Sequence, residues 1–279
     1  MIRLAVRCRP AEAEMVLAEL TVLAPGGVEE TNGDDYIEYA IYGAQGELPD
    51  VGALEAVSGQ ALVEVVATEV ADDWADRWRA FHKPLEIHGS ADGTSFWLRP
   101  PWETGGPGEF EVVIDPGQAF GTGAHPTTRL SLQLLLDLHD RGLSGGAITD
   151  LGTGSAVLAI AAAKLGYSPV TGYDHEVAAI AAARLNAAGN SVELFLSRLD
   201  LKQDFPRLAP TVVANLTAQL LEMVAGSMTP ENLPERLICS GLLEEERQRV
   251  ELAFEGLGLM PVEFKAADGW GGLLFEGKA

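Results

Sequence analysis

The alternation of hydrophobic and polar positions divides the chain into two parts with different element orders. The first part holds four short strand-like runs and two runs with helical spacing of apolar residues. The strands are predicted at 2–8, 28–31, 36–42 and 62–70, and the helices at 10–23 and 51–57. The resulting order, β-α-β-β-α-β, is that of a ferredoxin-like domain, which more often serves in recognition than in chemistry.

From about residue 145, apolar strands alternate with alanine-rich helices. The strands are predicted at 147–151, 170–173, 192–196, 211–214, 236–240, 260–265 and 272–275, and the helices at 156–165 and 177–188. This alternation predicts a parallel sheet with helices on both faces. The segment between the last two strands is too short for a crossover, so we expect these strands to form an antiparallel hairpin.

The stretch between the two parts has a pattern of its own. Trp74, Trp78 and Phe81 stand at i, i+4 and i+7, which is one face of a helix, and Pro84 ends the run. We interpret this face as an apolar stripe that packs on a neighbouring domain. The predicted organisation is a small recognition domain at 1–70, a linker with this amphipathic helix at 71–100, and a ligand-binding domain at 101–279 that begins with a strand at 110–114.

Composition narrows the class of protein. Of 279 residues, 47% are hydrophobic and 22% are charged, so the chain can bury a large core and is not disordered. Acidic residues outnumber basic ones 41 to 19, which gives a net charge of −22. Such a chain is a poor general binder of nucleic acid or anionic membranes and favours a basic partner.

The sequence shows no pattern of a targeting segment, a disulfide framework or a zinc site. The beginning of the sequence lacks the apolar run of a signal peptide, and no charge-free stretch is long enough for a transmembrane helix. Cys8 and Cys239 stand far apart in no C-x-x-C pattern, which predicts neither a disulfide framework nor a zinc site. We therefore expect a cytoplasmic protein without a bound metal.

A glycine-rich turn at 150–156 follows a predicted strand and precedes a helix. Gly152 and Gly154 let the backbone approach a ligand, and the helix N-terminus offers unpaired N–H groups. Asp174, at the end of the next strand, is placed to accept hydrogen bonds from ribose hydroxyls. The dinucleotide fingerprint would need a third small residue where Val157 stands. A tight turn without a ligand is the alternative.

Two further segments carry candidate chemistry. The loop 115–128 leads into a helix predicted at 129–139, with Thr127 or Thr128 as its N-cap. His125 in this loop is interpreted as structural rather than catalytic. Asn215 ends a buried strand and would face the ligand crevice, where its carbonyl oxygen could accept a hydrogen bond from an amine. An isolated asparagine at such a position is more often a strand or helix cap.

These segments together resemble the ordered motifs of class I S-adenosylmethionine-dependent methyltransferases, a Rossmann-like fold with an antiparallel last strand. The loop 115–128, the run 72–84 and the pair at 240–241 are similar to those of the ribosomal protein L11 methyltransferase family. The resemblance implies that the cofactor contacts are Thr128, Gly152, Gly154, Asp174 and Asn215. Asn215 would lie beside the reactive methyl group, and Asp200 is a looser match for the adenine amino group.

The resemblance implies an enzyme that transfers methyl groups to lysine and N-terminal amines of ribosomal protein L11, leaving S-adenosylhomocysteine. The N-terminal domain would hold this basic substrate, and we expect a monomer without sequence-specific nucleic-acid binding. Ala156 and His175 depart from common family residues. The alternatives are a methyltransferase of the same class acting on another protein amine or a small molecule, and a non-catalytic ribosome-associated adaptor. An NAD-linked oxidoreductase is disfavoured by Val157 and the terminal hairpin.

Overall fold

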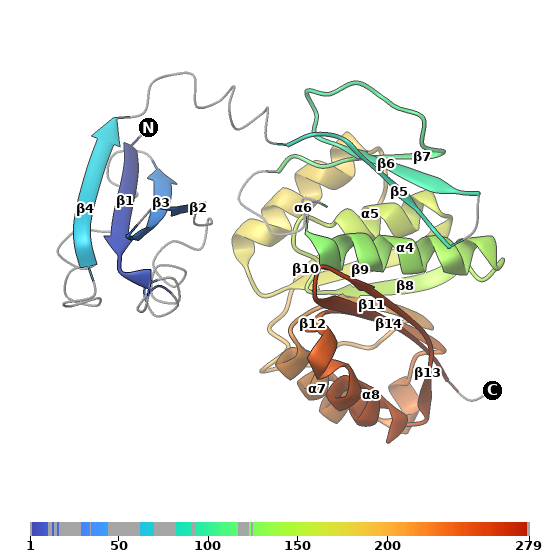
Figure 1. Ribbon diagram of the computed structural model, residues 1–279. Coiled ribbons are helices and arrows are strands. Elements are labelled where there is room, and N and C mark those ends of the chain that lie inside the picture. The colour runs from blue at the N-terminus through green and yellow to red at the C-terminus, as the bar shows by residue number, and fades with distance from the viewer. Residues whose placement is uncertain are drawn as a thin grey trace. The chain divides into compact units, whose positions relative to one another are not determined.

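The chain forms two compact units, Met1–Phe81 and His82–Ala279. Figure 1 shows the computed structural model and labels its elements. The structure describes residues 2–10, 13, 16, 29–33, 35–43, 62–69, 82–90, 93–116, 123 and 125–277. No helix in these described ranges is both long and apolar enough to cross a membrane.

The first unit contains a four-stranded sheet with the order β2-β3-β1-β4. Its strands are β1 (Ile2–Cys8), β2 (Glu29–Asn32), β3 (Ile37–Gly43) and β4 (Leu62–Glu69). All neighbouring strands are antiparallel. Strands lie at the four predicted places. The predicted helices lie outside the described residues except at Ala13 and Val16, which are both helical.

The second unit begins with a small sheet of three strands, in the order β5-β6-β7. They are β5 (Leu85–His88), β6 (Ser95–Arg99) and β7 (Phe110–Val113), of which only β7 was predicted. The proposed linker at 71–100 therefore contains two strands of the second unit. Both strands are short, so their alternation was too brief to recognise. Residues 71–81, where the amphipathic helix was expected, lie outside the described residues.

A seven-stranded sheet forms the centre of the second unit, with the order β10-β9-β8-β11-β12-β14-β13. β14 runs antiparallel to both β12 and β13, and the other neighbours are parallel. The predicted parallel sheet with a terminal hairpin is thus confirmed. The bounds are β8 Gly146–Leu151, β9 Tyr167–Asp174, β10 Phe195–Arg198, β11 Thr211–Asn215, β12 Arg236–Leu243, β13 Leu259–Ala267 and β14 Trp270–Gly277.

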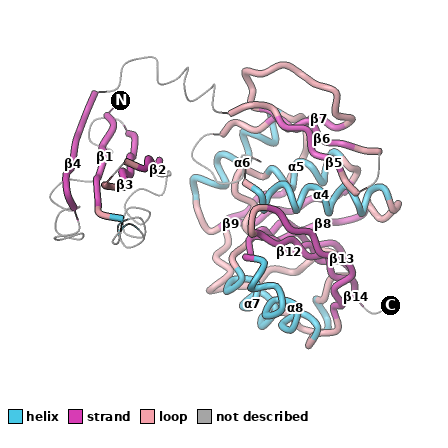
Figure 2. The backbone as a smooth tube through the Cα atoms, viewed as in Figure 1, coloured by secondary structure: helices cyan, strands magenta, loops and turns pink. Residues whose placement is uncertain are grey.

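Helices cover both faces of this sheet (Figures 1 and 2). One face carries α4 (Pro126–Asp140), α5 (Val157–Lys164) and α6 (Val177–Gly189). The opposite face carries α7 (Ala218–Ser227) and α8 (Arg247–Glu255). Two 3-10 turns, η3 (Pro230–Asn232) and η4 (Glu244–Glu246), complete this half. The small sheet β5-β6-β7 lies against α4 and α5, so those helices are enclosed between two sheets.

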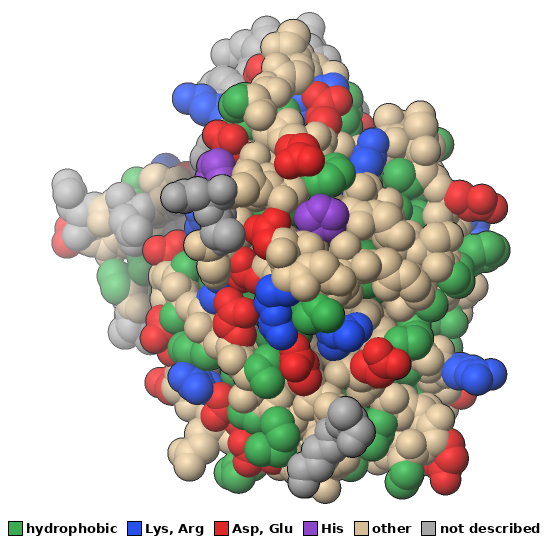
Figure 3. All heavy atoms as spheres, turned by 90° about the vertical axis from the view of Figure 1, so that its right-hand side faces the viewer, with side chains coloured by type: hydrophobic (Ala, Val, Ile, Leu, Met, Phe, Trp, Pro, Cys, Tyr) green, Lys and Arg blue, Asp and Glu red, His purple; other side chains and the backbone are tan. Residues whose placement is uncertain are grey.

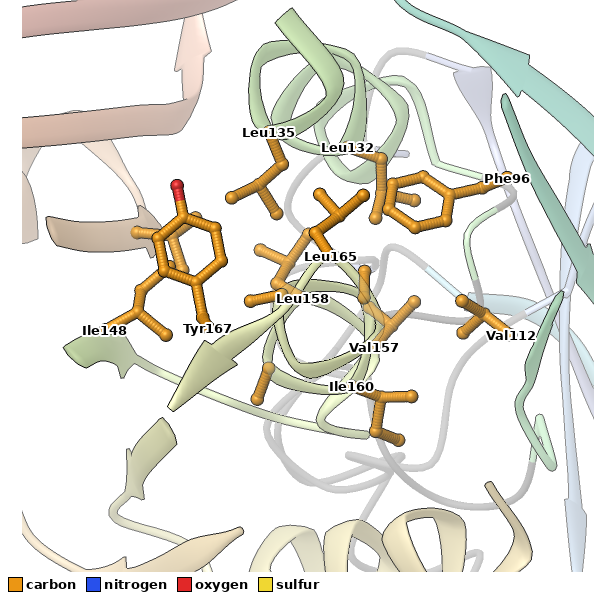
Figure 4. Packing of buried hydrophobic residues seen from close by; sticks show 14 of the residues in the cluster. Phe96, Val112, Leu132, Leu135, Ile148, Val157, Leu158, Ile160, Leu165 and Tyr167 are labelled. Carbon is orange, nitrogen blue, oxygen red and sulfur yellow. The ribbon is translucent and has the colours of Figure 1, made fainter. Parts of the chain in front are cut away.

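Strand periodicity explains why the sheet is apolar on both faces. In β11, Val213 joins the hydrophobic cluster beneath α4 and α5, whereas Val212 and Ala214 join the cluster beneath α7 and α8. Figure 4 shows the first cluster, in which Leu132 of α4 and Phe96 of β6 meet. Each side chain of this size stabilises the fold by roughly 1.5–3 kcal/mol when fully buried. This double core holds the carboxyl ends of the strands in fixed positions.

Candidate functional site

The carboxyl ends of β9, β8 and β11 bring the predicted site residues into one row. Leu151 pairs with Tyr173 of β9 on one side and with Ala214 of β11 on the other. The next residue along each strand is Gly152, Asp174 or Asn215. These three residues, far apart in the sequence, therefore end neighbouring strands at the same edge of the sheet, where open α/β sheets bind ligands.

The glycine turn after β8 is held close to β9 and to the residue after Asn215. The amides of Gly152 and Thr153 both donate to the Tyr173 carbonyl oxygen, at 2.9 and 2.8 Å. Gly152 has a φ of +73°, and a Cβ there would lie 2.5 Å from the Leu216 side chain. Glycine is favoured here because the backbone angle strains other residues and a Cβ would displace the end of the Leu216 side chain.

Asp174 is fixed by backbone donors from two loops. Its Oδ2 accepts from the Gly154 amide at 2.9 Å, and its Oδ1 accepts from the Glu176 amide at 3.0 Å. His175 places Nδ1 3.4 Å from the same Oδ1. Asp174 is only 9% exposed, so its carboxylate is a preoriented acceptor next to the glycine turn.

A second carboxyl group, Asp150, lies buried beneath the same turn. It is 1% exposed and accepts a hydrogen bond from the Thr153 hydroxyl at 2.7 Å. Burial raises the pKa of Asp150 from its ordinary 3.8 to about 7, and the charge of Asp174 acts in the same direction. Among the described residues, its Oδ1 has no hydrogen-bond partner. Burial therefore favours the neutral form of Asp150 next to the charged Asp174.

A pocket of about 160 Å³ opens beside these groups. It is lined by Gly152, Tyr173, Asp174, His175, Leu199, Asp200, Leu201, Lys202, Leu216 and Leu220. Gly152, Asp174 and the loosely matched Asp200 are thus brought to one cavity. Thr128, Gly154 and Asn215 are not among these lining residues, although Gly154 and Asn215 adjoin it through Asp174 and Leu216. The pocket therefore combines carboxyl groups, which can accept hydrogen bonds from a sugar, with leucine side chains, which can pack against a base.

Thr128 and Asn215 meet beyond the glycine turn. The Asn215 side-chain amide donates to the Thr128 hydroxyl oxygen at 3.4 Å, and Thr128 is completely buried. The predicted cap of this helix needs correction, because neither Thr127 nor Thr128 is the N-cap. The cap is His125, whose Nδ1 accepts from the Thr127 amide at 3.4 Å, and Pro126 occupies the first helical position that suits proline.

The state of the His125 ring agrees with this capping role. Its Nδ1 lies 2.8 Å from the Thr127 hydroxyl, and the ring meets Trp270 edge-to-face at 4.9 Å. Burial, together with the charge of Arg129, lowers the pKa of the His125 ring. A neutral ring can accept through Nδ1, so the structural interpretation of His125 fits these contacts.

A buried hydroxyl pair supports the site and was not recognised from the residue pattern. Ser240 of β12 lies 2.6 Å from the Ser131 hydroxyl of α4 and donates to the Thr127 carbonyl oxygen at 3.0 Å. Its own carbonyl accepts from the Leu216 amide at 2.9 Å. Ser240 thereby connects the start of α4 to the segment after Asn215. Two serines that stand 109 positions apart carry no local signal of this pairing.

The residues present suit S-adenosylmethionine. Its amino group and sulfonium are cationic, and the pocket lining supplies the carboxyl groups of Asp174 and Asp200. Its ribose needs a fixed acceptor, and the carboxylate of Asp174 fits that requirement because two backbone amides hold it. The bare backbone at Gly152 leaves room for close approach. The described residues contain no group of three histidine, cysteine or acidic side chains that could hold a metal.

The fold and this site define a class I S-adenosylmethionine-dependent methyltransferase. A family model described as ribosomal protein L11 methyltransferase (PrmA) matches residues 36–278. The chain therefore belongs to the ribosomal protein L11 methyltransferase family, as the sequence motifs had indicated.

Individual relatives agree with this assignment. The ribosomal protein L11 methyltransferase of Geotalea uraniireducens is 36% identical over 225 residues, covering 76% of this chain and 70% of that protein. The one from Geobacter metallireducens is 38% identical over 214 residues, with 76% and 68% covered. The solved structure of the ribosomal protein L11 methylase from Lactobacillus delbrueckii matches with a TM-score of 0.59 and 29% identity, covering 70% of this chain and 99% of that one.

Proposed function

We propose that this chain methylates ribosomal protein L11, at lysine side chains and at the N-terminal amine. The observation that carries the proposal is the position of Asn215 at the end of β11, one residue before the pocket-lining Leu216 and fixed to Thr128. In the proposal, Asp174 holds the ribose hydroxyls, and Gly152 and Gly154 lie along the methionine end. Thr128 and Asn215 lie beside the reactive methyl group.

The bound cofactor would supply a sulfonium methyl group that is electrophilic without a metal. The protein's task is to present a neutral amine in line with the methyl–sulfur bond. Lysine has a pKa of about 10.4, so deprotonation at pH 7 costs about 4–5 kcal/mol. A water-poor pocket reduces this cost because it disfavours the ammonium form.

Asn215 is suited to orient that amine. Because its side-chain nitrogen is committed to Thr128, its carbonyl oxygen is left to accept a hydrogen bond from the substrate. The backbone carbonyl of Leu216 would be a second acceptor, fixed through the Leu216 amide on Ser240. The amine proton would leave through water, since Asn215 cannot act as a strong base.

The charge of the chain favours a basic protein substrate. The net charge is −22, and Figure 3 shows acidic side chains interspersed with basic ones on one face. Such a field accelerates encounter with a basic partner and weakens with added salt. The proposal includes the N-terminal unit as the holder of L11, a monomeric enzyme in the cytoplasm, and no requirement for nucleic acid.

The decisive experiment combines the chain, S-adenosylmethionine and ribosomal protein L11, and weighs L11 by intact mass spectrometry. Gains in whole methylene units, mapped to lysines and the N-terminus by fragmentation and absent with Asn215→Ala, would support the proposal. Cofactor binding by calorimetry without any mass gain would reject L11 as substrate and leave another amine. Loss of both would favour the adaptor alternative.

A further inference from the structure

A second cavity, which we name the acceptor groove, lies at the same edge of the large sheet. It has a volume of about 650 Å³. It is lined by Thr217, Ala218, Gln219, Glu222, Gly241, Leu243, Glu246, Arg249 and Trp270. The lining comes from the start of α7, the ends of β12 and η4, the first half of α8 and the first residue of β14.

One short segment separates the groove from the cofactor pocket. Leu216 and Leu220 line the cofactor pocket, whereas residues 217–219 line the groove. Gly241, which lines the groove, packs its backbone directly against Leu216, which lines the cofactor pocket. A Cβ on Gly241 would lie 2.5 Å from the Leu216 carbonyl oxygen. Asn215 directly precedes this shared segment. The groove therefore adjoins the segment that follows Asn215 and that also borders the cofactor pocket.

The groove has a charge pattern suited to a basic chain. Arg249 contacts Glu222 at 2.8 Å and Glu246 at 3.5 Å, so two carboxylates share one guanidinium. The side chains of Glu222 and Glu246 remain 35% and 28% exposed. Their excess negative charge can take up a second cation from outside. Trp270 adds an aromatic surface, which attracts ammonium and guanidinium groups and covers their aliphatic stems.

We infer that the acceptor groove binds the polypeptide flanking the target amine and selects a basic side chain there through Glu222 and Glu246. This inference rests on the proposed methylation of L11. In-line transfer requires the amine to reach the methyl group from the side opposite the sulfur, and the groove is a cavity that adjoins the segment directly after Asn215. A basic residue next to the target amine would form ion pairs with the carboxylates of Glu222 and Glu246.

The double variant Glu222→Gln/Glu246→Gln tests the groove. We expect the KM for L11 to rise about five-fold at low salt, in keeping with two partly exposed ion pairs. The kcat should stay within about two-fold of wild type, and the calorimetric Kd for S-adenosylmethionine should not change. Added salt should shrink the difference between wild type and variant. A Gln219→Arg variant, which adds a cation to the groove, should raise the KM in the same direction.

The double variant Glu193→Gln/Glu235→Gln is the matched control. Both glutamates are exposed, neither lines the groove, and the pair changes the net charge by the same amount. If the control raises KM equally, the effect is long-range steering and the groove assignment is wrong. If wild type methylates L11 but the groove variants leave the KM unchanged, the groove inference is overturned and the proposed function stands. No L11 methylation by the wild type would overturn both the proposed function and this inference.

Discussion

The Asn215 side-chain nitrogen lies 3.4 Å from the Thr128 hydroxyl oxygen, although 87 positions separate the two residues in the chain. The contact joins the carboxyl end of β11 to the first turn of α4. It also determines which end of the amide faces the expected substrate, because the nitrogen is occupied by Thr128. The geometry of the candidate reaction centre therefore depends on α4, a helix from which we assign no proton donor or acceptor to the reaction.

Replacing either partner should reduce methyl transfer by different amounts. We expect Asn215→Ala to lower kcat about 100-fold, the usual cost of losing a preorganised hydrogen-bonding group in a transition state. Thr128→Val should lower kcat about ten-fold, because the amide of Asn215 loses its partner but remains present. Thr128→Ser keeps the hydroxyl and should retain most activity. Equal kcat for the Val and Ser variants, measured under saturating cofactor, would show that this contact does not orient Asn215.

Gly241 offers a test of how the segment after Asn215 is positioned. Its φ is +87°, and a Cβ would lie 2.5, 2.8 and 2.9 Å from three backbone atoms of Leu216, which cannot move aside cheaply. Gly241→Ala should lower the free energy of unfolding by about 3 kcal/mol, from backbone strain and overpacking together, and should also reduce kcat.

Gly142 provides the matched control for Gly241. It has a φ of +69°, but no atom lies within 4 Å of the place that a Cβ would occupy. Gly142→Ala should therefore cost only the backbone strain, about 1 kcal/mol, and leave kcat unchanged. Urea unfolding monitored by tryptophan fluorescence measures both changes. Similar losses in the two variants would mean that contact with Leu216 is not the constraint.

The buried carboxyl of Asp150 should make the stability of the second unit depend on pH. Its pKa is raised from 3.8 to about 7, so the folded chain keeps the proton while the unfolded chain releases it. Rising pH in this window therefore favours unfolding, by about 3 kcal/mol between pH 4 and pH 7. Asp150→Asn removes the ionisation and should gain stability relative to wild type as pH rises.

Denaturant unfolding at pH 5 and at pH 7 measures that difference. A constant gap between Asp150→Asn and wild type at the two pH values would contradict the raised pKa of Asp150. Asp174→Asn serves as a second check, because the charge of Asp174 contributes to the shift. Removing that charge should lower the pKa of Asp150 and flatten the pH dependence that Asp150 causes.

The parts of the fold that sequence predicted well are those with strong local patterns. The alanine-rich helices and apolar strands of the βαβ units show their period within a few residues, and the short link between β13 and β14 excludes a crossover. β5, β6 and α7 were not predicted. The strands are four and five residues long, too short to show a period. One predicted strand, 192–196, is found at 195–198, because Val192 and Leu194 pack on the core from a loop.

For the site, residues fixed by strand ends were predictable and residues fixed by tertiary contacts were not. Gly152, Asp174 and Asn215 follow strands, so their shared edge can be inferred from the alternation alone. The cap of α4 was assigned to threonine because hydroxyl residues are favoured there, but His125 before Pro126 fills the position. Ser131 and Ser240 meet only after α4 has packed on β12.

The proposed ribose contact of Asp174 yields the most direct binding test. Its carboxylate accepts from two backbone amides, of Gly154 and Glu176, and faces the cofactor pocket. In Asp174→Asn the charge is lost, and the new amide group can face a backbone N–H that it cannot satisfy. We expect the Kd for S-adenosylmethionine to rise about 10- to 100-fold, the range for hydrogen bonds to a charged group.

Asp204→Asn is the control for that measurement. Asp204 is exposed, lies outside the cofactor pocket and accepts from the adjacent Phe205 amide at 2.8 Å. It changes the net charge as Asp174→Asn does, so a general electrostatic effect on a cationic cofactor would appear in both variants. Calorimetric titration should show near wild-type affinity for Asp204→Asn. Comparable affinities for the two variants would place the ribose away from Asp174 and require a different acceptor, of which Asp200 is the candidate within the same pocket.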